Sequence, residues 1–256
     1  MREVNIPTRL GQISVSIDEH VNKTQPIVFM HGIFLDKTLW ANYPSTLTGH
    51  THIYIDMPAH GNSSNVGHDW HLSECPGMLI EVLDALDVEK CIVVGHSWGG
   101  MTALRTAQNH AKRFISIALF NTPFKATTGF RKLGFQSQKL LVIFQRFYAK
   151  QAAKSLYTQK ILEAHPELST QMQERLAARP AKELIRVLDA VILDAKDSTH
   201  LITELAIPTI AVVGESDYVG MMPKIKTMIV PGGHISPCEA PTETRAILVK
   251  LAKREY

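Results

Sequence analysis

The sequence predicts an α/β fold, in which a mainly parallel, eight-stranded β-sheet is covered by helices on both faces. Three observations lead to this fold class. Short apolar runs recur along the chain, amphipathic helical patterns separate them, and strand signals stop over one long segment. Continuous apolar runs are typical of strands buried on both faces, and strands alternating with helices are typical of parallel sheets. The segment without strand signals, from about residue 123 to 206, is predicted to be an all-helical insertion.

The first two strands are expected to form an antiparallel hairpin around Gly11, because the flanking segments VNIPTR and ISVSIDE show period-2 alternation. Six further strands are predicted from apolar runs, four before the insertion and two after it. They cover residues 26–31, 52–57, 91–95, 114–121, 209–214 and 226–230.

Helical patterns lie between these runs. The segment LSECPGMLIEVLDAL is expected to begin with Ser73 as its N-cap, and WGGMTALRTAQNH directly follows the strand at 91–95. A third helix closes the chain with Pro241 at its start and lysines near its end, where the helix dipole favours cations. In the insertion, KLGFQSQKLLVIFQRFYAKQAAKSLYTQKILEAH is predicted to be long and helical, and Pro166 and Pro180 then separate shorter helices.

The composition is that of a globular protein. Among 256 residues, 45% are hydrophobic and 20% are charged, which argues against a disordered or fibrous chain. An odd set of three cysteines (Cys75, Cys91 and Cys238) is no disulfide framework and favours a reducing compartment. We find no signal-like N-terminus and no apolar run near the roughly 20 residues that span a bilayer. We therefore expect a soluble, cytoplasmic protein without an integral membrane segment, of open oligomeric state.

Charge is distributed unevenly along the chain. The net charge is +3, but between Lys125 and Arg186 twelve Lys and Arg face four Glu, so this segment carries 12 − 4 = +8 and the remainder 15 − 20 = −5. Three interpretations stay open. The cations solvate exposed helix faces, or they steer an anionic substrate, or they rest on an anionic membrane surface.

The strongest motif is Gly95-His96-Ser97-Trp98-Gly99-Gly100, which directly follows one predicted strand and opens a helix. This strand–turn–helix context is the one in which G-x-S-x-G presents a nucleophilic serine. The glycines allow a tight turn, and the helix N-terminus favours developing negative charge beside Ser97. The alternative, an ordinary glycine-rich turn, is less consistent with this context.

A serine hydroxyl needs a base, and the base needs an acid that orients it. Among twelve histidines, His234 directly follows the last strand and so reaches the same carboxyl edge of the sheet as Ser97. Asp217 follows the preceding strand and completes the chain order Ser, Asp, His. Glu215 competes locally but sits tighter against its strand, while the other possible position for the acid holds Asn121, which cannot bear the charge.

Two backbone amides should stabilise an oxyanion. We assign Trp98, the residue after the nucleophile, and Ile33 in the loop after the strand at 26–31, with Phe34 as the alternative to Ile33. Phe34, His96 and Met222 are assigned to substrate binding because they adjoin these catalytic positions.

Taken in order, the segments HGIF, DMPAHGNS, GHSWGG, GESD and PGGH resemble the motifs of the α/β-hydrolase superfamily over nearly the whole chain. The resemblance implies the α/β-hydrolase fold, with a core at 1–122 and 201–256 and a helical cap at 123–200 that closes over the active site. Gly32 followed by Ile33, and later Trp40, is similar to the pattern of small esterases, C–C bond hydrolases and lactonases. One departure is the short stretch from Asp217 to His234, in which the helix usual in the family is expected to be a turn.

We therefore expect a serine hydrolase that cleaves a carboxylic ester or related acyl bond of a small molecule, without a cofactor and without nucleic acid as a partner. C–C bond hydrolysis, a cofactor-free dioxygenase that would use His96, and a non-enzymatic ligand receptor are the alternatives on this fold. No metal site is expected, since His68, His71 and Cys75 match ligand spacing only loosely. Substrate choice is expected to lie in the cap, where six residues recur at helical spacing, although most of the six are expected to pack against the core instead: Phe135, Leu140, Ile143, Phe144, Phe147 and Tyr148.

Overall fold

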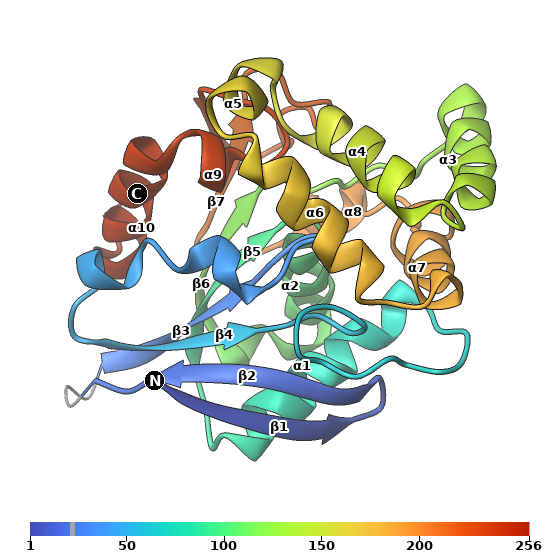
Figure 1. Ribbon diagram of the computed structural model, residues 1–256. Coiled ribbons are helices and arrows are strands. Elements are labelled where there is room, and N and C mark those ends of the chain that lie inside the picture. Colours follow the sequence, from blue (N-terminus) through green and yellow to red (C-terminus); the bar gives the residue numbers. More distant parts are fainter. Residues whose placement is uncertain (21–23, 256) are drawn as a thin grey trace.

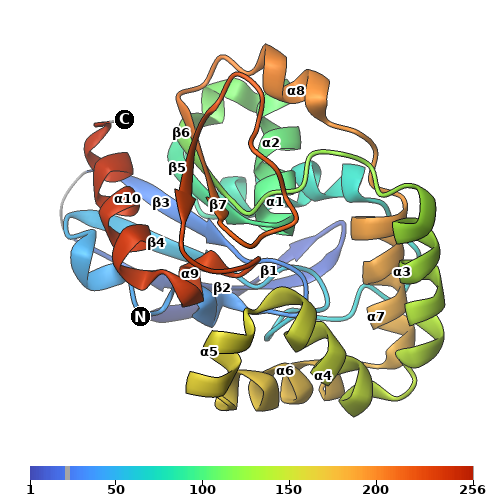
Figure 2. The same ribbon diagram turned by 90° about the horizontal axis from the view of Figure 1, so that it is seen from above.

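A computed structural model describes residues 1–20 and 24–255 and contains one eight-stranded sheet with helices on both faces (Figures 1 and 2). The strand order is β1-β2-β4-β3-β5-β6-β7-β8; the first two neighbouring pairs are antiparallel and the other five are parallel. The predicted fold class is confirmed. The strands are β1 (Arg2–Thr8), β2 (Gly11–Asp18), β3 (Thr24–Met30), β4 (His50–Ile55), β5 (Cys91–His96), β6 (Phe114–Phe120), β7 (Thr209–Gly214) and β8 (Lys226–Val230).

Helices enclose the sheet, so its central strands are buried on both faces. Every residue of β5 is buried. Figure 2 shows α10 on one face and α1 and α2 on the other. The core helices are α1 (Cys75–Ala85), α2 (Trp98–His110), α9 (Ser236–Glu239) and α10 (Pro241–Lys253), with short 3₁₀ turns η1 (Lys37–Trp40), η2 (Pro44–Thr46), η3 (Leu72–Glu74) and η4 (Ala111–Arg113).

The start of α1 differs from the prediction. Ser73 is not the N-cap, because the chain first makes the η3 turn and α1 begins only at Cys75. The carboxylate of Glu74 accepts a hydrogen bond from the His71 amide at 2.8 Å. Because this capping makes His71 the N-cap of the η3 turn, Ser73 lies inside the turn and caps no helix.

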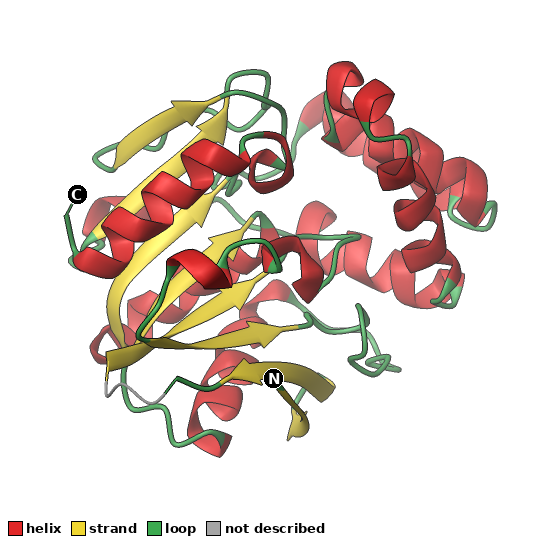
Figure 3. Cartoon of the chain, turned by 60° about the vertical axis from the view of Figure 1, so that its left-hand side comes forward, coloured by secondary structure: helices red, strands yellow, loops and turns green. Residues whose placement is uncertain are grey.

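Between β6 and β7 the chain contains helices only. They are α3 (Gly129–Leu141), α4 (Gln145–Leu156), α5 (Gln159–Ala164), α6 (Glu167–Ala177), α7 (Ala181–Leu188), the π-helix η5 (Asp189–Leu193) and α8 (Thr199–Glu204). We call residues 129–193 the cap, and Figure 3 shows its helices beside the sheet, at the end where the parallel strands finish. The boundaries 123 and 200 stay a prediction.

The expected long helix of the insertion is wrong, because the chain breaks twice. The first break lies at residues 142–144, between the end of α3 and the start of α4. The second precedes α5, where the Thr158 hydroxyl accepts from the Ile161 amide at 3.4 Å. That side-chain contact competes with continued helix at this point. None of the described helices has the length and apolar character needed to cross a bilayer.

Candidate active site

Ser97 occupies the tight turn between β5 and α2, with φ 49° and ψ −110°. Two glycines make this turn possible. A Cβ on Gly95 would lie 2.5 Å from the Gly100 nitrogen, and one on Gly99 would lie 2.6 Å from Met30 Cβ. The Ser97 amide donates to the Phe120 carbonyl at 2.8 Å, which fixes the turn to the neighbouring strand. The sequence motif therefore has the strained strand–turn–helix geometry that it predicts.

Three side chains from separate elements form one hydrogen-bonded row. The distance from Ser97 Oγ to His234 Nε2 is 2.9 Å, and that from His234 Nδ1 to Asp217 Oδ1 is 2.9 Å. A carboxylate only accepts hydrogen bonds, so Nδ1 carries the ring proton and Nε2 is left to accept from the serine hydroxyl. The side chains of His234 and Asp217 are 3% and 0% exposed, so water does not screen their interaction.

Asp217 is held ionised by its neighbours. Burial would raise the pKa of its carboxyl group, but hydrogen bonding to His234 and the charge of that ring lower it. Asn121 Nδ2 donates to the second carboxylate oxygen at 2.7 Å, and the Val219 amide donates to the first at 3.3 Å. These contacts together hold the pKa of Asp217 below its usual value of 3.8.

The other acid considered from the sequence does not reach the base. Glu215 is exposed, and among the described residues its carboxylate has no hydrogen-bond or ion-pair partner. Asn121 cannot carry the charge of the acid, but the structure places it against the acid, a contact that the sequence analysis does not predict. It sits at the end of β6 with φ 47° and binds Asp217 and the Gly233 carbonyl. A polar residue at a strand end beside the base was the available signal.

The loop after β3 separates the two candidate oxyanion donors. The Phe34 amide donates to His60 Nε2 at 2.9 Å and is therefore occupied. Burial lowers the pKa of His60 to about 3, which keeps the ring neutral and Nε2 able to accept. No acceptor for the Ile33 or Trp98 amide lies among residues 1–20 and 24–255, and Ile33 lines the cavity over Ser97. These two amides are free to receive an anionic oxygen.

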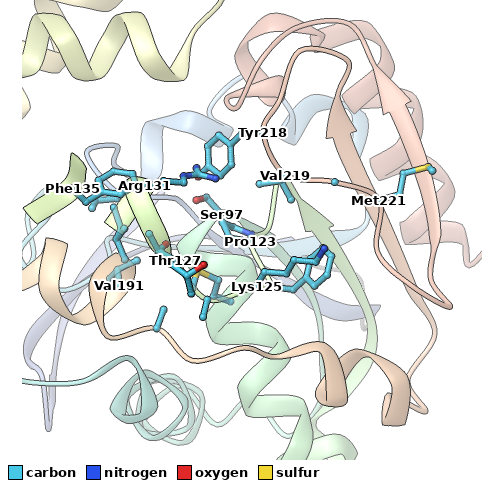
Figure 4. A pocket seen from close by; sticks show the side chains of 18 residues that line it. Ser97, Pro123, Lys125, Thr127, Arg131, Phe135, Val191, Tyr218, Val219 and Met221 are labelled. Carbon is cyan, nitrogen blue, oxygen red and sulfur yellow. The ribbon is translucent and has the colours of Figure 1, made fainter. Parts of the chain in front are cut away.

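A cavity of about 470 Å³ opens over Ser97 (Figure 4). Its walls come from the loop after β6, from α3, from η5 and the residues that follow it, and from the loop after β7. Among the described residues that line it, Lys125 and Arg131 are the charged ones, and both are cations. The walls include Met101, Phe124, Phe135, Val191, Val219 and Met221. The cavity walls are thus mixed in polarity and carry two cationic side chains.

The ring of His234, the ring of Tyr218 and the guanidinium group of Arg131 stack in that order. The Tyr218 ring lies 4.7 Å from the His234 ring at 18°, and the guanidinium carbon of Arg131 lies 3.8 Å from the centre of the Tyr218 ring. The Tyr218 side chain is 48% exposed, and the nearby Asp217 charge raises the pKa of its phenol, which stays neutral. Its hydroxyl lies 3.4 Å from His234 Nε2. Figure 4 shows Arg131, from α3, beside Tyr218, and the Tyr218 ring in turn stacks on His234.

The three predicted substrate-binding residues do not line this cavity. Phe34 packs its edge against the Tyr148 ring at 5.7 Å. His96 is buried and donates to the His234 carbonyl at 2.7 Å, and burial lowers its pKa to about 3. Met222 is also buried, whereas its exposed neighbour Met221 lines the cavity. Adjacency in the chain does not carry a side chain into the cavity, because neighbouring residues point in different directions.

Most of the six cap residues expected to pack against the core do not. Tyr148 is buried and Phe135 lines the cavity. The other four are more than half exposed: Leu140, Ile143, Phe144 and Phe147. For these four the packing interpretation is wrong.

The three residues with loose metal-ligand spacing differ in burial. Cys75 is buried in α1, whereas His68 and His71 are exposed loop residues. A different set, Asp18, His20 and His52, brings its ligand atoms within 4.8 Å of one another. It lies where β2 ends and β4 begins, at the edge of the sheet opposite Ser97. It is therefore separate from the row of Ser97, His234 and Asp217.

Comparison with known proteins places these features in a wider group. A family model described as the alpha/beta hydrolase fold matches residues 25–219. The chain is 25% identical over 223 residues to 3-oxoadipate enol-lactonase 1 of Acinetobacter baylyi, which covers 85% of this chain and 80% of that protein. The structure of this chain is similar to that of a thermophilic esterase from Thermogutta terrifontis, with a TM-score of 0.84 and 20% identity. The match covers 100% of this chain and 99% of the esterase chain.

Other similarity is local. A dihydrolipoyllysine-residue acetyltransferase component of an acetoin cleaving system, from Pseudomonas putida, is 33% identical over 95 residues. That match covers 37% of this chain and 26% of the relative, so the chain spans about a quarter of that protein's length.

Proposed function

Because the chain belongs to the alpha/beta hydrolase fold family, we propose that it is a serine hydrolase that cleaves a carboxylic ester or a related acyl bond. The observation that carries this proposal is the row from Ser97 through His234 to Asp217, with both hydrogen bonds at 2.9 Å. Nucleophile and base at hydrogen-bond distance, with the base oriented by an acid, are the arrangement that activates a serine hydroxyl.

In the proposed reaction, Ser97 Oγ attacks the substrate carbonyl while His234 Nε2 takes its proton. The imidazolium that forms is stabilised by the ionised Asp217. The Ile33 and Trp98 amides donate to the oxygen that becomes negative, and the N-terminus of α2 adds a favourable dipole there. His234 then returns the proton to the leaving group, and a water molecule repeats the sequence on the acyl-enzyme.

We assign to the substrate an anionic group beside the scissile bond. Lys125 and Arg131 line the cavity without an acidic residue among its walls, and neither forms an ion pair with another described residue. An unpaired guanidinium group favours a carboxylate, which it can bind through two hydrogen bonds. The enol-lactonase relative is named for a lactone of 3-oxoadipate, a dicarboxylate, and it fits this substrate class.

Nothing in the geometry favours the dioxygenase alternative. His96 would have to exchange protons with the substrate, yet it does not line the cavity and its Nε2 is engaged by the His234 carbonyl. Hydrolysis of a C–C bond uses the same row and stays the second candidate, because a 2-hydroxy-6-oxononadienedioate hydrolase of Cupriavidus pinatubonensis is 25% identical over 213 residues.

The decisive experiment measures turnover of p-nitrophenyl esters by the wild-type protein and by Ser97→Ala. We expect kcat to fall by a factor on the order of 10³ or more with the melting temperature unchanged. A fluorophosphonate probe should label the wild-type protein at Ser97 alone. Full turnover in the variant, or labelling at another serine, would rule out this nucleophile. Wild-type protein that hydrolyses no ester but cleaves a vinylogous 1,5-diketone would favour the C–C alternative.

A further inference from the structure

Helix α3 has 13 residues, and none of them is buried. This is unusual, because an amphipathic helix normally covers its apolar stripe with the protein core. Phe130 is 93% exposed, Leu140 is 74% exposed and Leu133 is 60% exposed. A large apolar residue exposed singly is ordinary, but a whole helix face of them indicates a missing partner.

The two faces of α3 have different surroundings. At about 100° per residue, Arg131 and Phe135 share one face, and they line the cavity over Ser97. Phe130, Leu133 and Leu140 share another face, which is roughly opposite and points to solvent. The outer stripe is therefore not needed to build the cavity.

Exposed apolar residues continue along the chain beyond α3. The turn at residues 142–144 exposes Ile143 and Phe144, and α4 exposes Phe147. We call the seven exposed apolar residues the apolar surface of the cap: Phe130, Leu133, Leu140, Leu141, Ile143, Phe144 and Phe147. They fall within 18 consecutive residues, and Figure 1 shows α3 at the outer margin of the molecule.

Cations accompany this surface. The buried residues of α4 lie on one face, and Lys150 and Lys154 lie on the opposite, exposed face with Phe147, while Arg146 is exposed at the border between the two faces. Helices α3 and α4 contain six Lys and Arg and no Asp or Glu. Among the described residues, the ion pairs of these two helices are limited to that between Lys139 and Asp189. A second copy of this chain would bring six like charges against six, so self-association is disfavoured.

We infer that the apolar surface of the cap docks onto a lipid bilayer that contains anionic headgroups. Exposed phenylalanine and leucine side chains flanked by lysine and arginine are the composition of helices that lie in the membrane interface. The apolar side chains would enter the boundary between headgroups and acyl chains, while Arg146, Lys150 and Lys154 would meet the anionic headgroups. The inner face of α3 would continue to line the cavity, now beside the membrane.

The test is sedimentation with vesicles of phosphatidylcholine, with and without phosphatidylglycerol. Using Ser97→Ala as the parent protein prevents turnover, so binding is measured independently of the proposed hydrolase function. We expect binding to the phosphatidylglycerol vesicles that weakens with salt. Phe130→Asp and Leu133→Asp should each lower the ratio of bound to free protein about tenfold or more. Lys150→Gln should lower it about fivefold.

Matched controls lie on β8, away from the cap. Ile229 is 62% exposed and Lys226 is exposed, so Ile229→Asp and Lys226→Gln change the same chemistry elsewhere. Both should bind vesicles as the parent protein does. The inference is overturned if the parent does not bind phosphatidylglycerol vesicles, or if the controls lose as much binding as the cap variants. It is also overturned if the parent is a dimer that binds no vesicles and Phe130→Asp makes it monomeric in analytical ultracentrifugation, since the surface then joins two copies.

Discussion

Replacing Asp217 with asparagine removes the charge that faces His234 while keeping the size of the side chain. The atoms concerned are 2.9 Å apart and both side chains are buried. At an effective dielectric constant of about 20, a carboxylate stabilises an imidazolium 3 to 4 Å away by about 4 to 6 kcal/mol. Since about 1.4 kcal/mol changes a rate tenfold, Asp217→Asn should lower kcat by a factor of about 10³ to 10⁴.

The neighbouring Asn121 adds a second reason for this loss. Its Nδ2 donates to the outer oxygen of Asp217 at 2.7 Å and would hold the oxygen of the new amide in that place. The amide nitrogen would then face His234 Nδ1 and donate to it. The ring proton would move to Nε2, which could no longer accept a proton from Ser97.

The assay compares kcat and KM of the wild-type protein, Asp217→Asn and Glu215→Gln on one p-nitrophenyl ester. Glu215 is the matched control, because it lies two residues away on the same loop and its side chain is exposed. We expect Glu215→Gln to retain full kcat and both variants to keep a KM near that of the wild-type protein. If Glu215→Gln is inactive and Asp217→Asn is active, the assignment of the acid is wrong.

Three further predictions concern the same site. Asn121→Ala should lower kcat about tenfold to a hundredfold, because it removes one hydrogen bond to a charged, buried group, worth about 1.5 to 3 kcal/mol; pre-steady-state measurement of the acylation rate checks this, and an unchanged rate would contradict it. Gly95→Ala should lower the melting temperature strongly or prevent folding, since its Cβ would meet backbone atoms at 2.5 Å; thermal denaturation tests it, with a melting temperature within a degree or two of wild type as the contrary result. The kcat/KM of an anionic ester should fall with ionic strength while that of a neutral ester of equal size barely moves, because the Debye length shrinks from about 30 Å at 0.01 M salt to about 3 Å at 1 M. Arg131→Gln should flatten the curve of the anionic ester. Parallel curves for the two esters in the wild-type protein would rule out the proposal that the substrate is anionic.

The pKa of Asp217 also predicts how stability depends on pH. A carboxyl whose pKa is lower in the folded state stabilises the protein above its unfolded-state pKa, here 3.8, and loses that contribution as the pH falls through the folded-state value. The wild-type protein's advantage over Asp217→Asn in free energy of unfolding should therefore shrink as the pH falls through the folded-state pKa of Asp217, below 3.8. An advantage that stays constant in urea titrations from about pH 5 into strong acid would contradict the lowered pKa.

Local patterns were sufficient for the core of the molecule. Each parallel strand was recognisable as an apolar run, and the turn at Ser97 as two glycines whose missing Cβ atoms leave room for backbone. Because parallel strands end at one edge, the order of the elements alone predicts that the residues that follow β5, β7 and β8 meet there. Asn121 shows the limit of that reasoning. Its role depends on a hydrogen bond to the second carboxylate oxygen of Asp217, and the order of the elements does not predict that contact.

Periodicity was a weaker guide in the cap, because it shows which residues share a face but not what that face contacts. Leu140 and Phe144 follow the same helical spacing as Tyr148, yet only Tyr148 is buried. The break at residues 142–144 has no proline or glycine to signal it. Long-range packing alone decides whether such a stripe meets the core, lines a cavity or faces solvent.

The two faces of α3 connect the substrate proposal with the membrane proposal and also separate them. Arg131 faces the cavity and stacks on Tyr218, so a change there acts on the substrate and on His234. Phe130 precedes it by one residue but lies on the solvent face, so Phe130→Asp leaves the cavity walls intact. If both proposals hold, Arg131→Gln alters selectivity between anionic and neutral esters without affecting vesicle binding, and Phe130→Asp does the reverse. A single variant that alters both properties equally would mean that α3 moves as a whole, and neither proposal could then be assigned to one face of the helix.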